Sequence, residues 1–184
     1  AQDKNNQWAI SFGNNAVDFH PVGTDSSDNA TGHWFSEYFN IHENWNTQTA
    51  LNSVSISRYG NEKFNFGIRG SLNQITRLGD ERNRISAKRI ASLDVLVDYK
   101  LGKNFNFCNI EPYLEAGTGY TWFGSQKSHT MNGGLGLNVP ISEKVSLNVN
   151  SAYKHAFNDM QDLQSHIQHT VAVAINFGGK DTDR

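Results

Sequence analysis

The sequence predicts an all-β protein, an eight-stranded antiparallel up-and-down transmembrane β-barrel with a plugged polar lumen. In segments of about ten residues, apolar side chains alternate with small or polar ones, which is the two-residue period of a β-strand. A tilted strand needs about 9–11 residues to cross a bilayer core. No run reaches the roughly 18 apolar residues of a membrane-spanning helix, so a membrane location requires a closed barrel.

Eight segments carry this alternation, and segment 168–177 shows it most clearly. There His169 and every second residue to Phe177 share one face, and small or polar residues share the other. The expected strands are 7–19, 51–59, 64–73, 91–99, 110–122, 131–139, 145–154 and 168–177. In the second strand Tyr59 is out of phase, which predicts either a bulge or an Arg58 side chain that extends to the membrane edge. An even number of strands is typical of a single-chain bacterial barrel.

The expected connections alternate between long and short. The longer ones are 20–50, 74–89 and 155–166, and the shorter ones are 60–63, 101–109 and 140–144. A short connection at 124–128 departs from this pattern. Long loops at one end and short turns at the other are typical of outer-membrane barrels.

Alternation alone leaves two orientations of the apolar face. A soluble, lipocalin-like barrel turns it inward around a ligand, whereas a membrane barrel turns it outward to lipid. The aromatic residues of this face gather at the strand ends and favour the second orientation, because such rings settle at the headgroup level. We expect one aromatic girdle at Trp8, Phe64, Tyr99 and Phe177 and the other at Tyr120, Trp122 and Tyr153. Between the girdles, the residues expected to face lipid are Val95, Leu114, Leu135, Val149 and Val173.

The other face is small and polar, with charges near the middle of the strands. An eight-stranded barrel has an interior just wide enough for its own side chains, so these charges should pair across the lumen. The expected ion-pair network consists of Arg69, Asp94, Asp98, Glu115 and Lys154. A filled, charged lumen argues against a wide porin.

Other function classes find little support in the sequence. The net charge of −2 and the lack of a basic stripe give no argument for nucleic acid. The single cysteine, Cys108, has no partner in the chain for a disulfide. His155, His166 and His169 lie near one connection and could meet a metal, but their spacing is not diagnostic of a metal site. No serine, histidine and carboxylate are expected to converge, so we predict no enzyme, no metal and no cofactor.

Segment 34–45 is unusually aromatic for a connection. It either folds back over the barrel rim or extends the second strand, or else it forms a docking surface for lipopolysaccharide or a protein partner. Both kinds of interpretation stay open on the sequence.

Four segments carry a resemblance to a known family. They are NAVDF at 15–19, FNFG at 64–67, EPYLEAGTGYTW at 111–122 and NFGGKDTD at 176–183. With these motifs, nearly the whole chain resembles the amino-terminal barrel of the outer membrane protein A family. It is most similar to the branch in which the barrel is followed by Asp-rich, thrombospondin-type-3-like calcium repeats and a peptidoglycan-binding domain. Asp181 and Asp183 would then be the first ligands of an incomplete calcium motif.

The resemblance implies an anchor in the bacterial outer membrane. Residues 1–177 would form the barrel, and 178–184 would begin a periplasmic Asp-rich linker. The chain starts at Ala1 without a methionine, as an exported protein does after signal cleavage. Expected partners are outer-membrane lipid, lipopolysaccharide and, through a later domain, peptidoglycan. The alternatives are an accessory subunit of a larger outer-membrane protein complex or a small channel or transport barrel.

Overall fold

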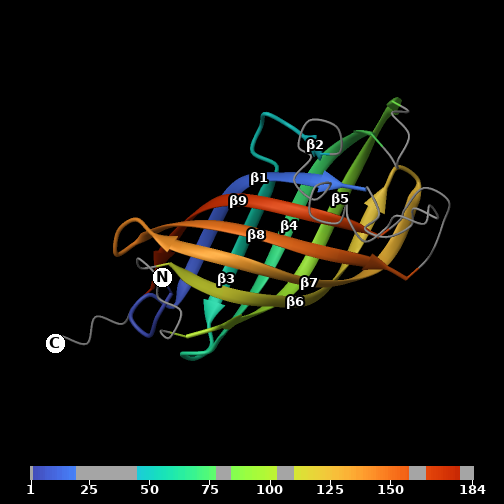
Figure 1. Ribbon diagram of the computed structural model, residues 1–184. Helices are drawn as coiled ribbons and strands as arrows, with labels where there is room; N and C mark the ends of the chain where they lie inside the picture. The colour runs from blue at the N-terminus through green and yellow to red at the C-terminus, as the bar shows by residue number, and fades with distance from the viewer. Residues whose placement is uncertain (1, 20–44, 78–83, 103–109, 158–164, 179–184) are drawn as a thin grey trace, which may run out of the picture.

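The computed structural model describes residues 2–19, 45–77, 84–102, 110–157 and 165–178, which form one closed β-barrel (Figure 1). The strands are β1 (Trp8–Asp18), β2 (Trp45–Thr47), β3 (Ser53–Tyr59), β4 (Phe64–Arg77), β5 (Arg84–Lys100), β6 (Glu111–Phe123), β7 (Gln126–Pro140), β8 (Val145–Ala156) and β9 (His166–Phe177). Within these residues there is no helix long and apolar enough to cross a membrane.

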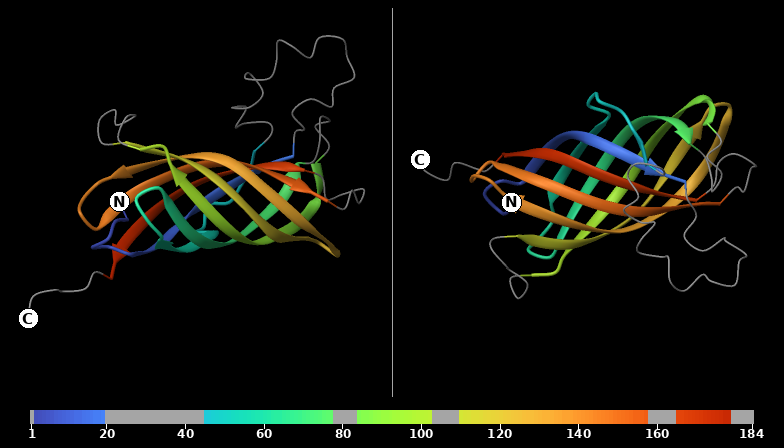
Figure 2. Two further views of the ribbon diagram at one scale, coloured as in Figure 1. Left: turned by 90° about the horizontal axis from the view of Figure 1, so that it is seen from below. Right: turned by 45° about the horizontal axis from the view of Figure 1, so that its top comes forward.

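Each long strand pairs antiparallel with its neighbours, and the sheet closes on itself. The closing pair is β1 with β9, which runs from Trp8 opposite Phe177 to Asp18 opposite Ile167. β1 begins and β9 ends at the same end of the barrel (Figures 1 and 2). We call this the turn end, because the β3–β4 and β7–β8 turns also lie there, and we call the opposite end the loop end. The three-residue strand β2 pairs only with β1, and the other eight strands form the closed ring. The predicted eight-stranded antiparallel barrel is confirmed.

The strands are longer at the loop end than the sequence pattern indicated. β4 runs to Arg77, β5 begins at Arg84, β8 ends at Ala156 and β9 begins at His166. The expected connections 74–89 and 155–166 were therefore wrong in their bounds. Backbone pairing continues there beyond the apolar band. The outward side chains become polar and the inward ones include the buried Ile75, Ile90 and Ala156, so the alternation that marks the membrane-spanning part is lost.

The second expected strand is β3, and it contains no bulge. Arg58 lies opposite Trp8 on one side and Phe66 on the other in an unbroken register. Its guanidinium carbon lies 5.4 Å from the centre of the Trp8 ring. Arg58 is therefore the outward-facing residue at the barrel edge, and Tyr59 belongs to the inward phase.

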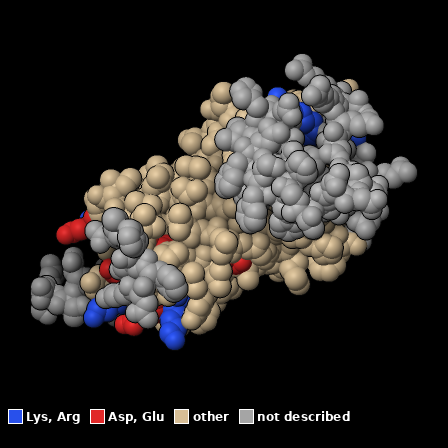
Figure 3. All heavy atoms as spheres, viewed as in Figure 1, with Lys and Arg blue, Asp and Glu red and all other residues tan. Residues whose placement is uncertain are grey.

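Burial follows the two-residue period in the way that a membrane barrel requires. Outward apolar side chains are exposed, with Leu135 62% and Val95 56% accessible, whereas the polar phase is largely buried. In Figure 3 the middle of the barrel is almost free of charged side chains, and red and blue atoms gather at the turn end. The apolar face thus points outward, where lipid can cover it.

Candidate functional site: the lumen and the rims

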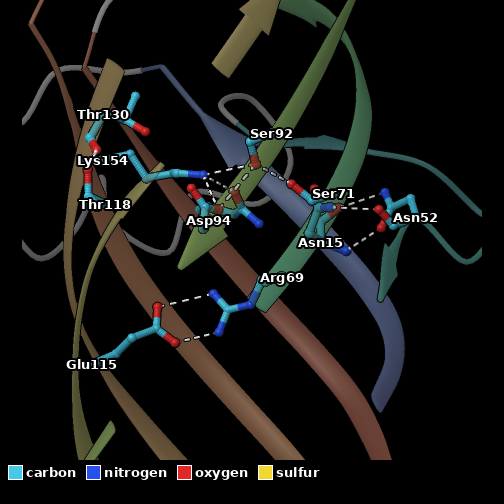
Figure 4. A network of polar contacts seen from close by, with 11 residues as sticks. Asn15, Asn52, Arg69, Ser71, Ser92, Asp94, Glu115, Thr118, Thr130 and Lys154 are labelled. Carbon is cyan, nitrogen blue, oxygen red and sulfur yellow. Dashed lines mark hydrogen bonds and ion pairs between the residues drawn. The ribbon is translucent and has the colours of Figure 1, made fainter. Parts of the chain in front are cut away.

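An arginine–glutamate pair crosses the lumen between β4 and β6. Both Nη atoms of Arg69 donate to the carboxylate of Glu115, one of them over 3.1 Å (Figure 4). The Asn150 amide of β8 donates to the same carboxylate at 3.2 Å. All three side chains are buried. This paired geometry is the strongest form of the arginine–carboxylate interaction.

A second pair joins β8 to β5 closer to the loop end. The Lys154 ammonium donates to Asp94 Oδ2 at 2.7 Å, to Ser92 Oγ at 2.9 Å and to Gln168 Oε1 at 3.3 Å (Figure 4). Ser92 in turn shares a 2.7 Å hydrogen bond with Ser71 on β4. Side chains from four strands therefore meet inside the barrel.

Asp98 is placed differently from the other four residues of the expected network. It lies directly opposite Glu115 on the neighbouring strand. Its Oδ1 atom has no hydrogen-bond partner among the described residues. The structure thus brings Arg69 to Glu115 and Lys154 to Asp94, and it leaves Asp98 beside a polar cavity of about 90 Å³ in the turn-end half of the lumen.

The loop end of the lumen is closed by apolar side chains. They come from β1, β4, β5, β6 and β8 and from the residue after β1: Val17, Phe19, Ile75, Ile90, Phe123 and Ala156. The Phe19 and Phe123 ring centres lie 5.6 Å apart, and His166 packs on Phe19 at 4.9 Å. We call this cluster the apolar plug. Sequence reasoning missed it, although apolar residues in the polar phase of several strands, all near one end, were a usable signal.

Four buried asparagines hold β1, β2 and β4 together near the interruption before β3. Asn15 and Asn52 bond reciprocally, with the Asn15 backbone N–H donating to Asn52 Oδ1 at 2.6 Å. The Asn73 amide donates to Asn15 Oδ1 at 2.8 Å and to the Asn46 carbonyl at 2.9 Å. These side chains replace ladder hydrogen bonds where residues 48–52 leave the sheet, a role that no sequence pattern indicated.

Replacing Asn52 with alanine should destabilise the barrel by about 1–3 kcal/mol, because it leaves the buried Asn15 N–H without an acceptor. Urea unfolding in lipid vesicles would measure the loss. Asn61→Ala is the matched control, since Asn61 accepts backbone hydrogen bonds in an exposed turn. Equal effects of the two substitutions would contradict a special role for the buried cluster.

The expected girdle residues lie at the two ends of the outward face. At the turn end Trp8 lies opposite Phe177, and the Phe64 and Tyr99 rings are 5.2 Å apart. At the loop end the Tyr120 and Trp122 rings are 4.9 Å apart, and Tyr153 is exposed on β8. Aromatic rings therefore flank the aliphatic belt on both sides.

His169 is the one polar residue in the outward phase of β9, and β2 accounts for it. The Trp45 ring stacks on the His169 ring with centres 4.1 Å apart and covers the imidazole. β2 pairs with β1 beyond the end of β3, so Trp45–Thr47 extends the line of the second expected strand. The rest of segment 34–45 lies outside the described residues.

The described residues contain no group of three or more histidines, cysteines or acids arranged to hold a metal ion. The linker residues Asp181 and Asp183, and Cys108, also lie outside the described part of the chain. The last described residue, Gly178, has a φ of +82°, a conformation that suits glycine.

The barrel is similar in fold to solved outer-membrane barrels. The N-terminal β-barrel domain of Pseudomonas aeruginosa OprF aligns with a TM-score of 0.55 at 13% identity, covering 95% of this chain and 100% of that one. Neisserial surface protein A aligns with a TM-score of 0.59 at 10% identity, covering 92% and 96%. OprG from Pseudomonas aeruginosa aligns with a TM-score of 0.58 at 12% identity, covering 94% and 97%.

No protein-family model matches the sequence, and no curated protein matches it. At these identities the solved structures establish the fold and not a family. The closed eight-stranded barrel, its apolar outer belt and its aromatic rims together make this chain a bacterial outer-membrane β-barrel.

Proposed function

We propose that this barrel is the outer-membrane anchor of an envelope protein whose later domain binds peptidoglycan. The observation that supports the proposal is the position at which β9 ends. β9 ends at the turn end, where the Gly178 carbonyl accepts a hydrogen bond from the Gln7 N–H. Short turns of outer-membrane barrels face the periplasm. A chain that continues past Gly178 would therefore emerge on the side of the cell wall.

The filled lumen supports an anchor rather than a channel. Two ion pairs cross the interior, and the apolar plug closes the loop end. A barrel that only holds position in the membrane needs neither an open path nor a reactive site. The absence of an enzymatic activity is part of the same proposal.

The linker and the wall-binding domain come from the resemblance described above. Gly178 and Gly179 would act as a hinge, and Asp181 and Asp183 would begin an Asp-rich calcium repeat. The OprF structure is described as an N-terminal barrel domain, so in that protein a barrel of this fold is one domain of a larger chain. In this proposal outer-membrane lipid surrounds the apolar belt, and lipopolysaccharide contacts the loop end. The alternative is that the barrel is a subunit of a larger outer-membrane protein complex.

The proposal is tested with the complete gene product and a version that stops after Asp183. Both should insert into the outer membrane, but only the complete protein should co-sediment with detergent-washed peptidoglycan. Wall binding by the shortened protein would contradict the anchor model, as would full rescue of envelope integrity by the barrel alone in a deletion strain. Porin-sized conductance in planar bilayers would contradict the closed lumen and favour a channel.

A further inference from the structure

The outward face at the loop end of β5–β8 carries basic side chains beside aromatic ones. Its members, which we call the rim patch, are Arg89, Tyr120, Trp122, Lys127, His129 and His155. Strand register brings them together, because Trp122 lies opposite Lys127 and Tyr120 lies opposite His129. The Tyr120 and His129 rings meet edge to face at 4.8 Å. The patch therefore spans neighbouring strands of one continuous face.

The basic side chains of the rim patch are exposed and lack acidic partners among the described residues. Neither Arg89 nor Lys127 forms an ion pair with an acidic side chain in the described part of the chain. The exposed acids in the described part of the chain all lie at the turn end: Asp3, Glu62 and Glu143. In Figure 3 the end opposite the turn end shows blue atoms and no red ones among the described side chains in view. The described surface of the loop end is thus positive.

Apolar side chains continue directly below the patch towards the middle of the barrel. Leu93 lies opposite Tyr120, and Met131 lies opposite both Thr118 and His155. Leu93, Val95 and Met131 are all more than half exposed. The surface therefore presents basic and aromatic side chains together at the loop end and an aliphatic surface below them, which matches an amphiphile with an anionic head.

We propose that the rim patch binds a phosphorylated glycolipid of the outer leaflet, of the lipid A type. The inference rests on the proposed function in one respect, that the loop end faces the outside of the cell. Arg89 and Lys127 would contact the phosphates, and the His129 and His155 N–H groups would donate to phosphate or sugar oxygens. The aromatic rings would lie against the sugars, and the acyl chains would follow Leu93, Val95 and Met131.

The test measures lipid retention by the purified chain in detergent with native mass spectrometry. The two probes are diphosphoryl lipid A and the same lipid with its phosphates removed. The unchanged chain should retain the phosphorylated lipid preferentially. The double variant Arg89→Gln with Lys127→Gln should weaken that retention about tenfold or more. Lys63→Gln with Lys144→Gln removes the same charge from exposed turn-end positions and should change nothing.

Equal retention of the two lipids by the unchanged chain would overturn the proposal, and so would equal losses in the two double variants. If the rim double variant does not fold, Lys127→Gln alone, compared with Lys144→Gln, should still lower retention about fivefold. The assay contains no peptidoglycan, so a failure of wall anchoring leaves its result unchanged. Protease accessibility of the loops in intact cells tests the orientation separately.

Discussion

Replacing Arg69 with methionine is expected to destabilise the barrel by about 3–5 kcal/mol, because the substitution leaves the buried Glu115 carboxylate without its cationic partner. Asn150 would remain as a donor to that carboxylate, and one neutral hydrogen bond cannot replace a paired guanidinium. The measurement is the urea midpoint for reversible folding into lipid vesicles.

Arg58→Met is the matched control for this substitution. Arg58 is exposed at the turn end and contacts the Trp8 ring, so its loss should cost no more than about 1 kcal/mol. Combining Arg69→Met with Glu115→Leu should recover much of the stability, because no charge is then left unpaired. An unchanged midpoint for Arg69→Met alone would show that the lumen pair does not matter for folding.

Replacing Leu135 with arginine should cost about 2–4 kcal/mol, the penalty for a charge on the lipid face near the membrane midplane. Leu135 lies five residues before the end of β7 and is 62% exposed on the outward face. Val95→Arg on β5 should have a similar effect, because Val95 also faces outward and lies at a comparable distance from the turn end of its strand. Folding yield and urea midpoint in vesicles measure the loss.

Ile141→Arg is the control for the lipid-face substitutions. Ile141 is equally exposed, but it lies in the turn after β7, at the edge of the membrane rather than inside it. Its substitution should cost about 0–1 kcal/mol. Normal folding of Leu135→Arg and Val95→Arg would contradict the assignment of this face to lipid.

The arrangement of strands could be predicted because one physical rule governs every strand. Lipid outside and packed polar side chains inside impose the same two-residue period on all of them, so the residue pattern identified the outward face of β4 and β5 without any tertiary information. The rule weakens where the membrane ends. This is why the loop-end parts of β4, β5, β8 and β9 were taken for connections.

Partners inside the lumen could not be predicted in the same way. Arg69 lies directly opposite Asp94 in the β4–β5 register, yet it bonds to Glu115 across the lumen, while Asp94 pairs with Lys154. The strand register determines which backbone positions lie side by side. Which charged groups meet inside the barrel depends on the length and direction of their side chains. The apolar plug has the same origin, because its residues from β1, β4, β5, β6 and β8 become neighbours only when the barrel closes.

The sequence by itself determined the fold class and the two faces of the strands, since both follow from local alternation. The set of charges expected in the interior followed from that alternation together with the aromatic residues at the strand ends. Only the tertiary structure decided that Asp98 stands apart from the two ion pairs, that Trp45 covers His169, and that basic side chains of β5 and β7 meet aromatic ones on one outer rim. Those relations depend on barrel closure and strand register, which join residues that lie far apart in the chain.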